Sequence, residues 1–322
     1  MSSTLRTAVI GCGGAGTNHA TGYARADGAE LIAVCDLDAD RAATLAADQD
    51  VPWTDDVDDL LADHEPDLVS VATPERHHVA PAATALGAGA DVLCEKIMAD
   101  SVAGARELEA TAADHGRTLA VNYNYRHMPS FATIADAVAA GRLGAVRLVS
   151  ADVHAYGWHH GLDLLRFLLG EPTSVRAHTV DENALRAERF RFDGPLYIPT
   201  HAAVATLAFG DGAVASISSS IHSALEDHLI DLAVTGEDGR VRLMGMTPAD
   251  STGSVAPGLL RGELEDCAPI TLEESFHRSV AAVVDAVRDG RSPPTTGADG
   301  RQLVELEAAI RRAADTGTEI DL

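Results

Sequence analysis

Apolar residues in the first third of the chain gather in short continuous runs, and alanine-rich, helix-like segments separate these runs. The runs predict strands at residues 7–12, 31–36, 67–73, 91–96 and 118–124, with helices at 15–26 and 37–48 among the segments between them. Because the runs are continuous rather than alternating, we expect each strand to be buried on both faces. Repeated strand–helix units of this kind indicate a parallel, doubly wound α/β domain.

The pattern changes after about residue 122. A helix is expected at 130–144, followed by longer strands at 145–155, 174–180, 202–209, 213–221, 229–236 and 240–245. The glycine turns GDGA and GEDGR separate pairs of these strands and indicate hairpins. Two helices, at 276–290 and 298–315, follow. We therefore expect one domain at 1–122 and a second, α+β domain with a mostly antiparallel open sheet at 123–322.

Charge limits the classes of partner. The formal net charge is −25, so a nucleic-acid backbone or an anionic membrane would be repelled, and we expect neither as a partner. Of the 24 basic residues, only Lys96 is a lysine. An acid excess with arginine in place of lysine is typical of a halophilic protein, because molar salt shortens the screening length to about 3 Å. A GC-rich genome would produce the same arginine bias.

The chain shows no sign of a secreted or membrane protein. Its first residues run directly into the first predicted strand, without the apolar segment of a signal peptide. No apolar run reaches the ~20 residues of a membrane span. The cysteines, Cys12, Cys35, Cys94 and Cys267, lack C-x-x-C spacing and are expected to be free thiols. We expect a soluble, cytoplasmic protein.

Candidate chemistry begins directly after the first predicted strand. Gly11, Gly13 and Gly16 form a G-x-G-x-x-G, with Gly14 and Ala15 inside it, between a strand and a helix. The first glycine permits a tight turn, the second lets the backbone approach a pyrophosphate, and the third lets the helix pack on the strand. The helix N-terminus faces the phosphates. This context indicates a Rossmann domain that binds a dinucleotide; a glycine turn without a cofactor is the alternative.

Asp36 lies twenty residues beyond Gly16, at the end of the second predicted strand. A carboxylate at this place accepts hydrogen bonds from the ribose hydroxyls and repels a 2′-phosphate. No arginine follows Asp36 directly. The sequence therefore favours NAD over NADP.

Two further strand ends carry polar residues. Thr73 and Pro74 end one strand, and the pair Glu95–Lys96 ends the next. Ligands of doubly wound sheets bind at the carboxyl ends of strands, so we expect these four residues around one site. His77 and His78 follow in the first turn of a helix, where His78 either contacts the cofactor or is a solvated surface residue.

Lys96 is the strongest single candidate, because the chain uses arginine for its other cations. An ammonium at this place can bind a substrate hydroxyl and stabilise the developing alkoxide during hydride transfer. Arginine is a poor substitute, since its guanidinium is planar and stays protonated. A lysine whose pKa is shifted by burial could also relay a proton. An ordinary surface lysine is the alternative.

Together, GCGGAG, CD, ATPERHH and GADVLCEK resemble the Gfo/Idh/MocA family of NAD(P)-dependent oxidoreductases, and the resemblance covers essentially the whole chain. The family signature Glu-Lys-Pro is Glu95-Lys96-Ile97 here. The resemblance also implies that Asn122 and Arg126, in VNYNYRHMPSF, lie among the cofactor-binding residues.

The segment HAYGWHHGLDLLRFLLG is similar to a family motif that opens a helix facing the nicotinamide. His160 and Asp163 fit its H-x-x-D, so the resemblance makes His160 the base that takes the substrate proton. Two residues depart from the motif: Tyr156 replaces an aspartate and Trp158 replaces a glycine. The resemblance thus implies Lys96 and His160 as catalytic residues, with Asp163 and Tyr156 in support.

The glycine-rich loop that usually precedes this motif is missing, so the segment 189–201, with Tyr197 and His201, is expected to complete the substrate pocket. A metal site built from His154, His159, His160 and Asp163 is a minor alternative, and we expect no metal. The resemblance implies a sugar, inositol or polyol substrate and a homodimer or homotetramer. Two other functions remain open: a cofactor-binding regulator without catalysis, and NAD-dependent glycoside cleavage.

Overall fold

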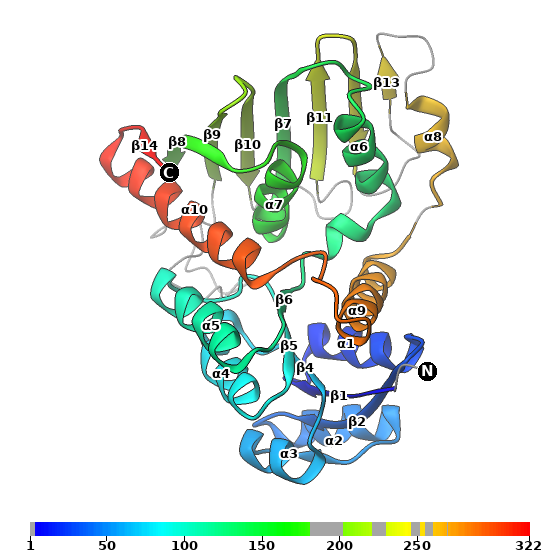
Figure 1. The fold of residues 1–322 in the computed structure, drawn as a ribbon. Coiled ribbons are helices and arrows are strands. Elements are labelled where there is room, and N and C mark those ends of the chain that lie inside the picture. Colours follow the sequence, from blue (N-terminus) through cyan, green and yellow to red (C-terminus); the bar gives the residue numbers. More distant parts are fainter. Residues whose placement is uncertain (1–3, 181–201, 221–229, 246–251, 255–259, 269) are drawn as a thin grey trace. The chain divides into compact units, whose positions relative to one another are not determined.

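The computed structural model of the chain describes residues 4–180, 202–220, 230–245, 252–254, 260–268 and 270–322 (Figure 1). The chain divides into two compact units. Unit 1 comprises Met1–Asn124 and Leu272–Val304, and unit 2 comprises Tyr125–Thr271 and Glu305–Leu322.

Unit 1 contains a parallel sheet in the order β3-β2-β1-β4-β5-β6. Its strands are β1 (Leu5–Ile10), β2 (Ala29–Cys35), β3 (Trp53–Thr54), β4 (Leu68–Val71), β5 (Asp91–Cys94) and β6 (Leu119–Val121). The four residues of β4 are all buried, as the continuous apolar runs predict. The order reverses at β1, so the carboxyl ends of β1 and β4 meet at the switch point where such sheets bind ligands.

The helices of unit 1 form two groups. They are α1 (Gly14–Arg25), α2 (Ala39–Gln49), α3 (Val57–His64), α4 (Val79–Gly87), α5 (Val102–His115) and α9 (Leu272–Arg288). Helix α1 contacts α2 and α9, whereas α4 contacts α3 and α5. The chain runs one way through β1, β2 and β3 and the other way through β4, β5 and β6. Right-handed crossovers therefore put the two groups on opposite faces of the sheet, and the doubly wound prediction is confirmed.

Helix α9 differs from the sequence-based expectation, which placed it in the second domain. Its valines Val280, Val283 and Val284 are buried in the same core as Tyr23 of α1. The apolar stripe of α9 packs against α1, although the two helices are far apart in sequence. The segment Leu272–Val304 therefore belongs to unit 1, while the division after Asn124 lies close to the expected boundary.

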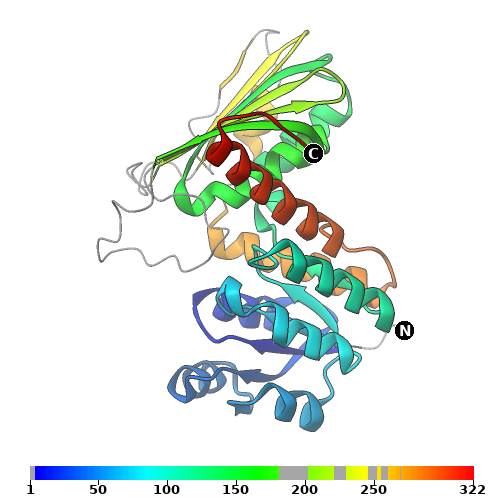
Figure 2. The same cartoon turned by 90° about the vertical axis from the view of Figure 1, so that its left-hand side faces the viewer.

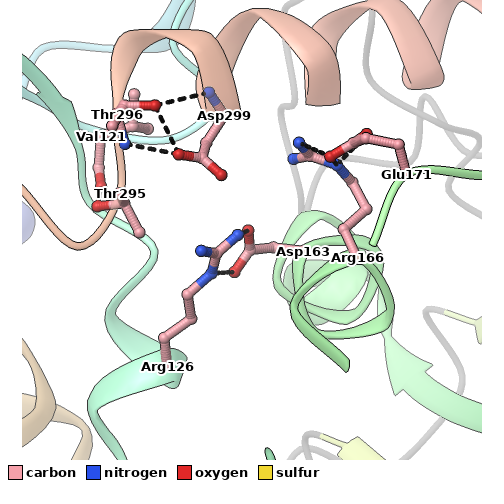
Figure 3. Close-up of polar contacts among 8 residues, drawn as sticks. All are labelled: Val121, Arg126, Asp163, Arg166, Glu171, Thr295, Thr296 and Asp299. Atoms are coloured by element: carbon pink, nitrogen blue, oxygen red, sulfur yellow. Dashed lines mark hydrogen bonds and ion pairs between the residues drawn. The ribbon is translucent and has the colours of Figure 1, made fainter. Parts of the chain in front are cut away.

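The loop after α9 is fastened to β6. Thr295 Oγ1 donates to the carbonyl oxygen of Val121 at 2.5 Å. Thr296 and Asp299 then cap the next helix, since the amide of Thr296 donates to Asp299 Oδ2 at 2.8 Å and the amide of Asp299 donates to Thr296 Oγ1 at 3.2 Å (Figure 3). This reciprocal pair satisfies amides that have no partner inside the helix. It starts α10 (Gly297–Thr316), within which the division between the units falls.

Unit 2 contains a sheet in the order β13-β12-β11-β7-β10-β9-β8-β14. Its strands are β7 (Val146–His154), β8 (Pro172–Thr179), β9 (Ala202–Phe209), β10 (Val214–Ser220), β11 (Ile230–Gly236), β12 (Arg240–Met244), β13 (Thr252–Ser254) and β14 (Ile320–Asp321). Both glycine turns form the expected hairpins, β9–β10 and β11–β12. The prediction of a mostly antiparallel sheet is confirmed, with one parallel pair, β7–β10.

The helices of unit 2 are α6 (Pro129–Ala139), α7 (Trp158–Leu169) and α8 (Arg261–Asp266), with short 3-10 turns η2 (Asn124–His127), which starts one residue before the unit, and η3 (Ala155–Gly157). A third 3-10 turn, η1 (Glu75–His77), belongs to unit 1. Helix α7 lies against one face of the sheet, over β7 and β10 (Figures 1 and 2). Gly161 permits this contact, because a Cβ there would lie 2.7 Å from Ile217 Cδ1. Within the described ranges, no helix has the length and apolar character that crossing a membrane requires.

The core position of α9 gives a stability prediction. Val284 is fully buried, whereas Val180, which follows β8, is 52% exposed. Val284→Ala removes two buried methyl groups, so we expect the free energy of unfolding to fall by about 2 kcal/mol. The matched substitution Val180→Ala should change it by less than about 0.5 kcal/mol. Denaturant unfolding of both variants tests this, and equal effects would contradict the assignment of α9 to the core of unit 1.

Candidate functional site

The turn after β1 can hold only glycine at two positions. Gly11 has a φ of +96°, and a Cβ there would lie 2.6 Å from the carbonyl carbon of Ala72. A Cβ on Gly16 would lie 1.7 Å from the carbonyl oxygen of Gly11. The first glycine thus permits the turn, and the third lets α1 start against the strand, as the motif predicts.

A cleft of about 720 Å³ opens beside this turn, entirely within unit 1. The predicted cofactor-binding residues that line it are Gly11, Gly13, Gly14, Ala15, Asp36, Thr73 and Pro74. A Cβ on Gly13 or Gly14 would meet no atom within 4 Å, so the backbone amides at the start of α1 border open space. A pyrophosphate can approach such amides closely, and the helix dipole favours its charge. The cleft therefore fits a dinucleotide.

Asp36 is held in place by two backbone amides. Its Oδ2 accepts from Cys12 N at 2.7 Å, and its Oδ1 accepts from Asp38 N at 2.9 Å. The sequence analysis missed Arg41, which lies in the first turn of α2 and also lines the cleft. Its Nη2 is 3.8 Å from Asp36 Oδ1. The five-residue spacing from Asp36 is a signal that could have pointed to it, because a helix starting at Ala39 returns this residue to the strand end.

His78 is a buried residue, so its description as a solvated surface histidine is wrong. It is 1% exposed, while His77 is exposed and lines the cleft. The ring nitrogens of His78 lie 2.7 Å from the carbonyl oxygen of Thr73 and 2.9 Å from that of Ile97. Burial lowers the pKa of His78, and the two carbonyls oppose this shift. The ring joins the segments after β4 and β5, and thereby holds Thr73 near Ile97.

Glu95 belongs to a buried polar cluster rather than to the lining of the cleft. His19 Nε2 lies 2.9 Å from Glu95 Oε1, and Asn122 Nδ2 donates to the same oxygen at 2.5 Å. His19 Nδ1 lies 2.9 Å from Ser70 Oγ, which is 2.6 Å from Tyr23 Oη. Burial alone would raise the pKa of Glu95, but the hydrogen bonds and charge of His19, with the Asn122 bond, hold it below its usual value. The glutamate is therefore a carboxylate inside unit 1.

Lys96 lies two residues beyond Cys94, the last residue of β5, at the carboxyl edge of the sheet. Its amide donates to Glu95 Oε2 at 3.2 Å, so the buried cluster fixes its backbone. Burial lowers the pKa of its ammonium, while the carboxylates of Glu95 and Glu75 oppose this shift. The ammonium of Lys96 therefore holds its proton less firmly than that of a surface lysine.

In unit 2, Arg126 and Asp163 form a buried bidentate ion pair (Figure 3). Arg126 Nε donates to Asp163 Oδ2 at 2.9 Å and Nη2 donates to Oδ1 at 2.6 Å. The guanidinium also lies 4.9 Å from the ring centroid of Phe167. This pair joins η2 to α7, so each of the two residues fixes the position of the other. The expectation that Arg126 binds the cofactor stays a prediction.

His160 lies in the first turn of α7 and is 6% exposed. Its ring stacks on Tyr125, with the ring centroids 3.9 Å apart and the planes inclined by 4°. Tyr125 stacks in turn on Phe131 of α6, at 6.0 Å and again 4°. Three nearly parallel rings therefore run from α6 through η2 to the predicted base.

The start of α7 is anchored by α10. The N-cap residue, Gly157, has no side chain that could accept a hydrogen bond from the first turn. Instead, Trp158 Nε1 donates to Glu307 Oε2 at 2.9 Å, and His159 Nε2 lies 3.8 Å from the same oxygen. Glu307 is fully buried. The helix dipole also stabilises a carboxylate beside a helix N-terminus. Glu307 is a partner of Trp158 that the sequence alone did not suggest.

Three predicted residues cannot be placed. The side chain of Tyr156 lies outside the described part of the structure, as do Tyr197 and His201. His154, which ends β7, is buried. Among the residues whose positions are described, no group of three or more His, Cys, Asp or Glu side chains could hold a metal ion.

Comparison with known proteins gives two family matches that together cover most of the chain. Residues 5–123 match an oxidoreductase family with an NAD-binding Rossmann fold, and residues 137–322 match the C-terminal α/β domain of that family. D-glucoside 3-dehydrogenase of Escherichia coli K12 is 28% identical, over 100% of this chain and 98% of that protein. Inositol 2-dehydrogenase 1 of Saccharopolyspora erythraea is 28% identical, over 99% of this chain and 96% of that protein.

Solved structures agree with the fold. The WlbA dehydrogenase from Bordetella pertussis, determined with NADH and UDP-GlcNAcA, superposes with a TM-score of 0.86, covers 100% of this chain and 99% of its own, and is 23% identical. Both domain types and their order are thus those of the family that the sequence motifs resemble. The chain belongs to the Gfo/Idh/MocA family of oxidoreductases with an NAD-binding Rossmann fold.

Proposed function

We propose that this protein is an NAD-dependent dehydrogenase that transfers a hydride between a secondary alcohol of a sugar, inositol or polyol and nicotinamide. The relatives named as glucoside and inositol dehydrogenases support this substrate class. The observation that carries the proposal is Lys96, the only lysine of the chain, at the carboxyl end of β5 in the unit that forms the dinucleotide cleft.

The cleft supports NAD as the cofactor. The amides at the start of α1 would hold the pyrophosphate, and Asp36 would accept hydrogen bonds from the adenosine ribose. The two backbone amides that donate to Asp36 hold its carboxyl group in place at the edge of the cleft. A 2′-phosphate would meet this carboxylate, which disfavours NADP.

We assign two tasks to the protein side chains in alcohol oxidation. Lys96 hydrogen-bonds the reacting hydroxyl and stabilises the negative charge that develops on its oxygen. His160 accepts the hydroxyl proton and becomes an imidazolium. Asp163, fixed by Arg126, holds the first turns of α7 in place.

The balance of the reaction is simple. When held in the cleft, the nicotinamide would accept the hydride of the carbinol carbon, which would convert NAD to NADH. The substrate becomes a carbonyl compound, and the hydroxyl proton leaves through His160. Reduction of a carbonyl uses the same groups in reverse, with His160 as the proton donor.

We further propose a homodimer or homotetramer formed through the sheet of unit 2. Leu148, Val204 and Val214 lie on one face of β7, β9 and β10 and are 47%, 47% and 43% exposed. Apolar residues gathered on one exposed sheet face are typical of a subunit interface.

The role of Lys96 is tested by substitution. NADH formation from NAD should be measured on a panel of inositols, aldoses, sugar acids and polyols, in low salt and in multimolar KCl. Lys96→Met should lower kcat/KM by about 100-fold or more, because the charge that stabilises the alkoxide is lost. NAD affinity should be unchanged. Turnover that survives Lys96→Met would sink the assignment, and tight NAD binding without turnover on any substrate would favour a regulator.

The lowered pKa of Lys96 predicts an alkaline limit to activity. Because burial lowers this pKa, the ammonium is lost, and activity with it, as the pH rises through a value below the usual 10.5. The pH profile of kcat/KM checks this. Lys96→Arg should have low activity but no alkaline limb, since arginine stays protonated; a limb that persists in this variant would assign the titration to another group.

Cofactor choice is tested at Asp36. Asp36→Ser should weaken NAD binding by about tenfold or more, since hydrogen bonds to a charged acceptor are lost. The same change should strengthen NADP binding, because Arg41 then faces the ribose without a competing carboxylate. The matched control is the double variant Asp36→Ser with Arg41→Ala, which should lose the gain in NADP affinity. Equal NADP affinity with and without Arg41 would contradict this role, and dissociation constants for both cofactors decide it.

A further inference from the structure

The ring stacked on His160 is not used in the mechanism above, and it bears directly on the proton that this residue carries. We propose that Tyr125 is a positioning residue, which fixes the plane of the His160 ring and stabilises its imidazolium form through the face of the phenol ring. This inference rests on the proposed function, in which His160 is the base.

The geometry of the stack is informative. The two centroids are 3.9 Å apart and the planes are inclined by only 4°, so the rings are stacked in parallel. The face of a tyrosine ring carries negative partial charge and attracts a cation placed over it. The stack therefore stabilises the imidazolium form of His160 more than a non-aromatic neighbour of similar size would.

Tyr125 is itself firmly held. It is 3% exposed, and Phe131, which is 1% exposed, stacks on it with planes inclined by 4°. Burial raises the pKa of the Tyr125 phenol, so the ring stays neutral and its face stays electron-rich. The next residue of η2, Arg126, forms the bidentate ion pair with Asp163 of α7, so the backbone beside the Tyr125 ring is joined to the helix that carries His160.

The stack offsets the unfavourable interaction between a positively charged His160 and the N-terminus of α7. His160 is the third residue of α7, and the N-terminus of a helix disfavours a positive charge. An imidazolium formed there needs a compensating interaction. The π-face of Tyr125 supplies one in direct contact.

The experiment leaves unchanged the titratable groups on α7 and on the elements that contact it. They include His159, Asp163 and Arg166 on α7, Arg126 on η2, His154 on β7, Asp136 on α6 and Glu307 on α10. A shift that appears only when residue 125 changes therefore reports the ring at that position.

The experiment compares Tyr125→Phe with Tyr125→Leu in the full chain. Phenylalanine keeps the π-face, whereas leucine keeps apolar cover without one. The His160 titration is followed by NMR of histidine-labelled protein without cofactor, with the signal assigned through His160→Gln. The midpoint should be unchanged in Tyr125→Phe and lower by about 0.5 to 1.5 pH units in Tyr125→Leu.

Kinetics provide a second readout. Tyr125→Leu should lower kcat by about tenfold with little change in KM or NAD affinity, and the acidic limb of its pH profile should move with the NMR midpoint. Thermal unfolding checks that each variant folds, and Tyr125→Met replaces the leucine variant if that one does not. The proposal is overturned if the His160 midpoint is unchanged in Tyr125→Leu. It is also overturned if Tyr125→Phe lowers the midpoint and kcat as much as Tyr125→Leu does. The NMR measurement needs no turnover, so it can contradict this proposal independently of whether the protein is a dehydrogenase.

Discussion

The buried Glu95 carboxylate is the interaction on which the organisation of unit 1 depends. A buried carboxylate costs several kcal/mol unless its oxygens are satisfied. Here His19 of α1, Asn122 after β6 and the amide of Lys96 all converge on it. Because these partners come from three segments, one charge fixes the glycine-turn helix, the end of β6 and the backbone of the only lysine together. The cofactor cleft and the proposed catalytic cation are thus placed by the same group.

In unit 2, buried polar groups gather around α7. This helix buries polar residues as well as apolar ones, including His160 and Asp163. Different neighbours contact them: Arg126 binds Asp163, Tyr125 stacks on His160, and Glu307 accepts a hydrogen bond from Trp158. The family motif has an aspartate at the place of Tyr156, and in this chain the ring of Tyr125 stacks on His160.

Much of the fold could be predicted from local pattern. The strand at 202–209 has the predicted bounds, and the glycines around 11–16 and Asp36 lie together at the edge of the sheet as their spacing indicates. These predictions succeed because strand burial and glycine turns depend on residues close in sequence. The parallel pairing of β7 with β10 and the packing of α9 on α1 could not be found this way, since each joins segments far apart in the chain.

The sequence by itself determined the α/β and α+β classes of the two domains, the dinucleotide turn and the choice of Lys96 as the candidate cation, because each depends on residue type and spacing. Only the tertiary structure decided which side chains meet. It buried His78 between two backbone carbonyls, brought Arg41 to Asp36, and set Tyr125 against His160. The physical reason is that a local pattern fixes the face on which a residue lies, whereas its partner depends on how distant segments pack.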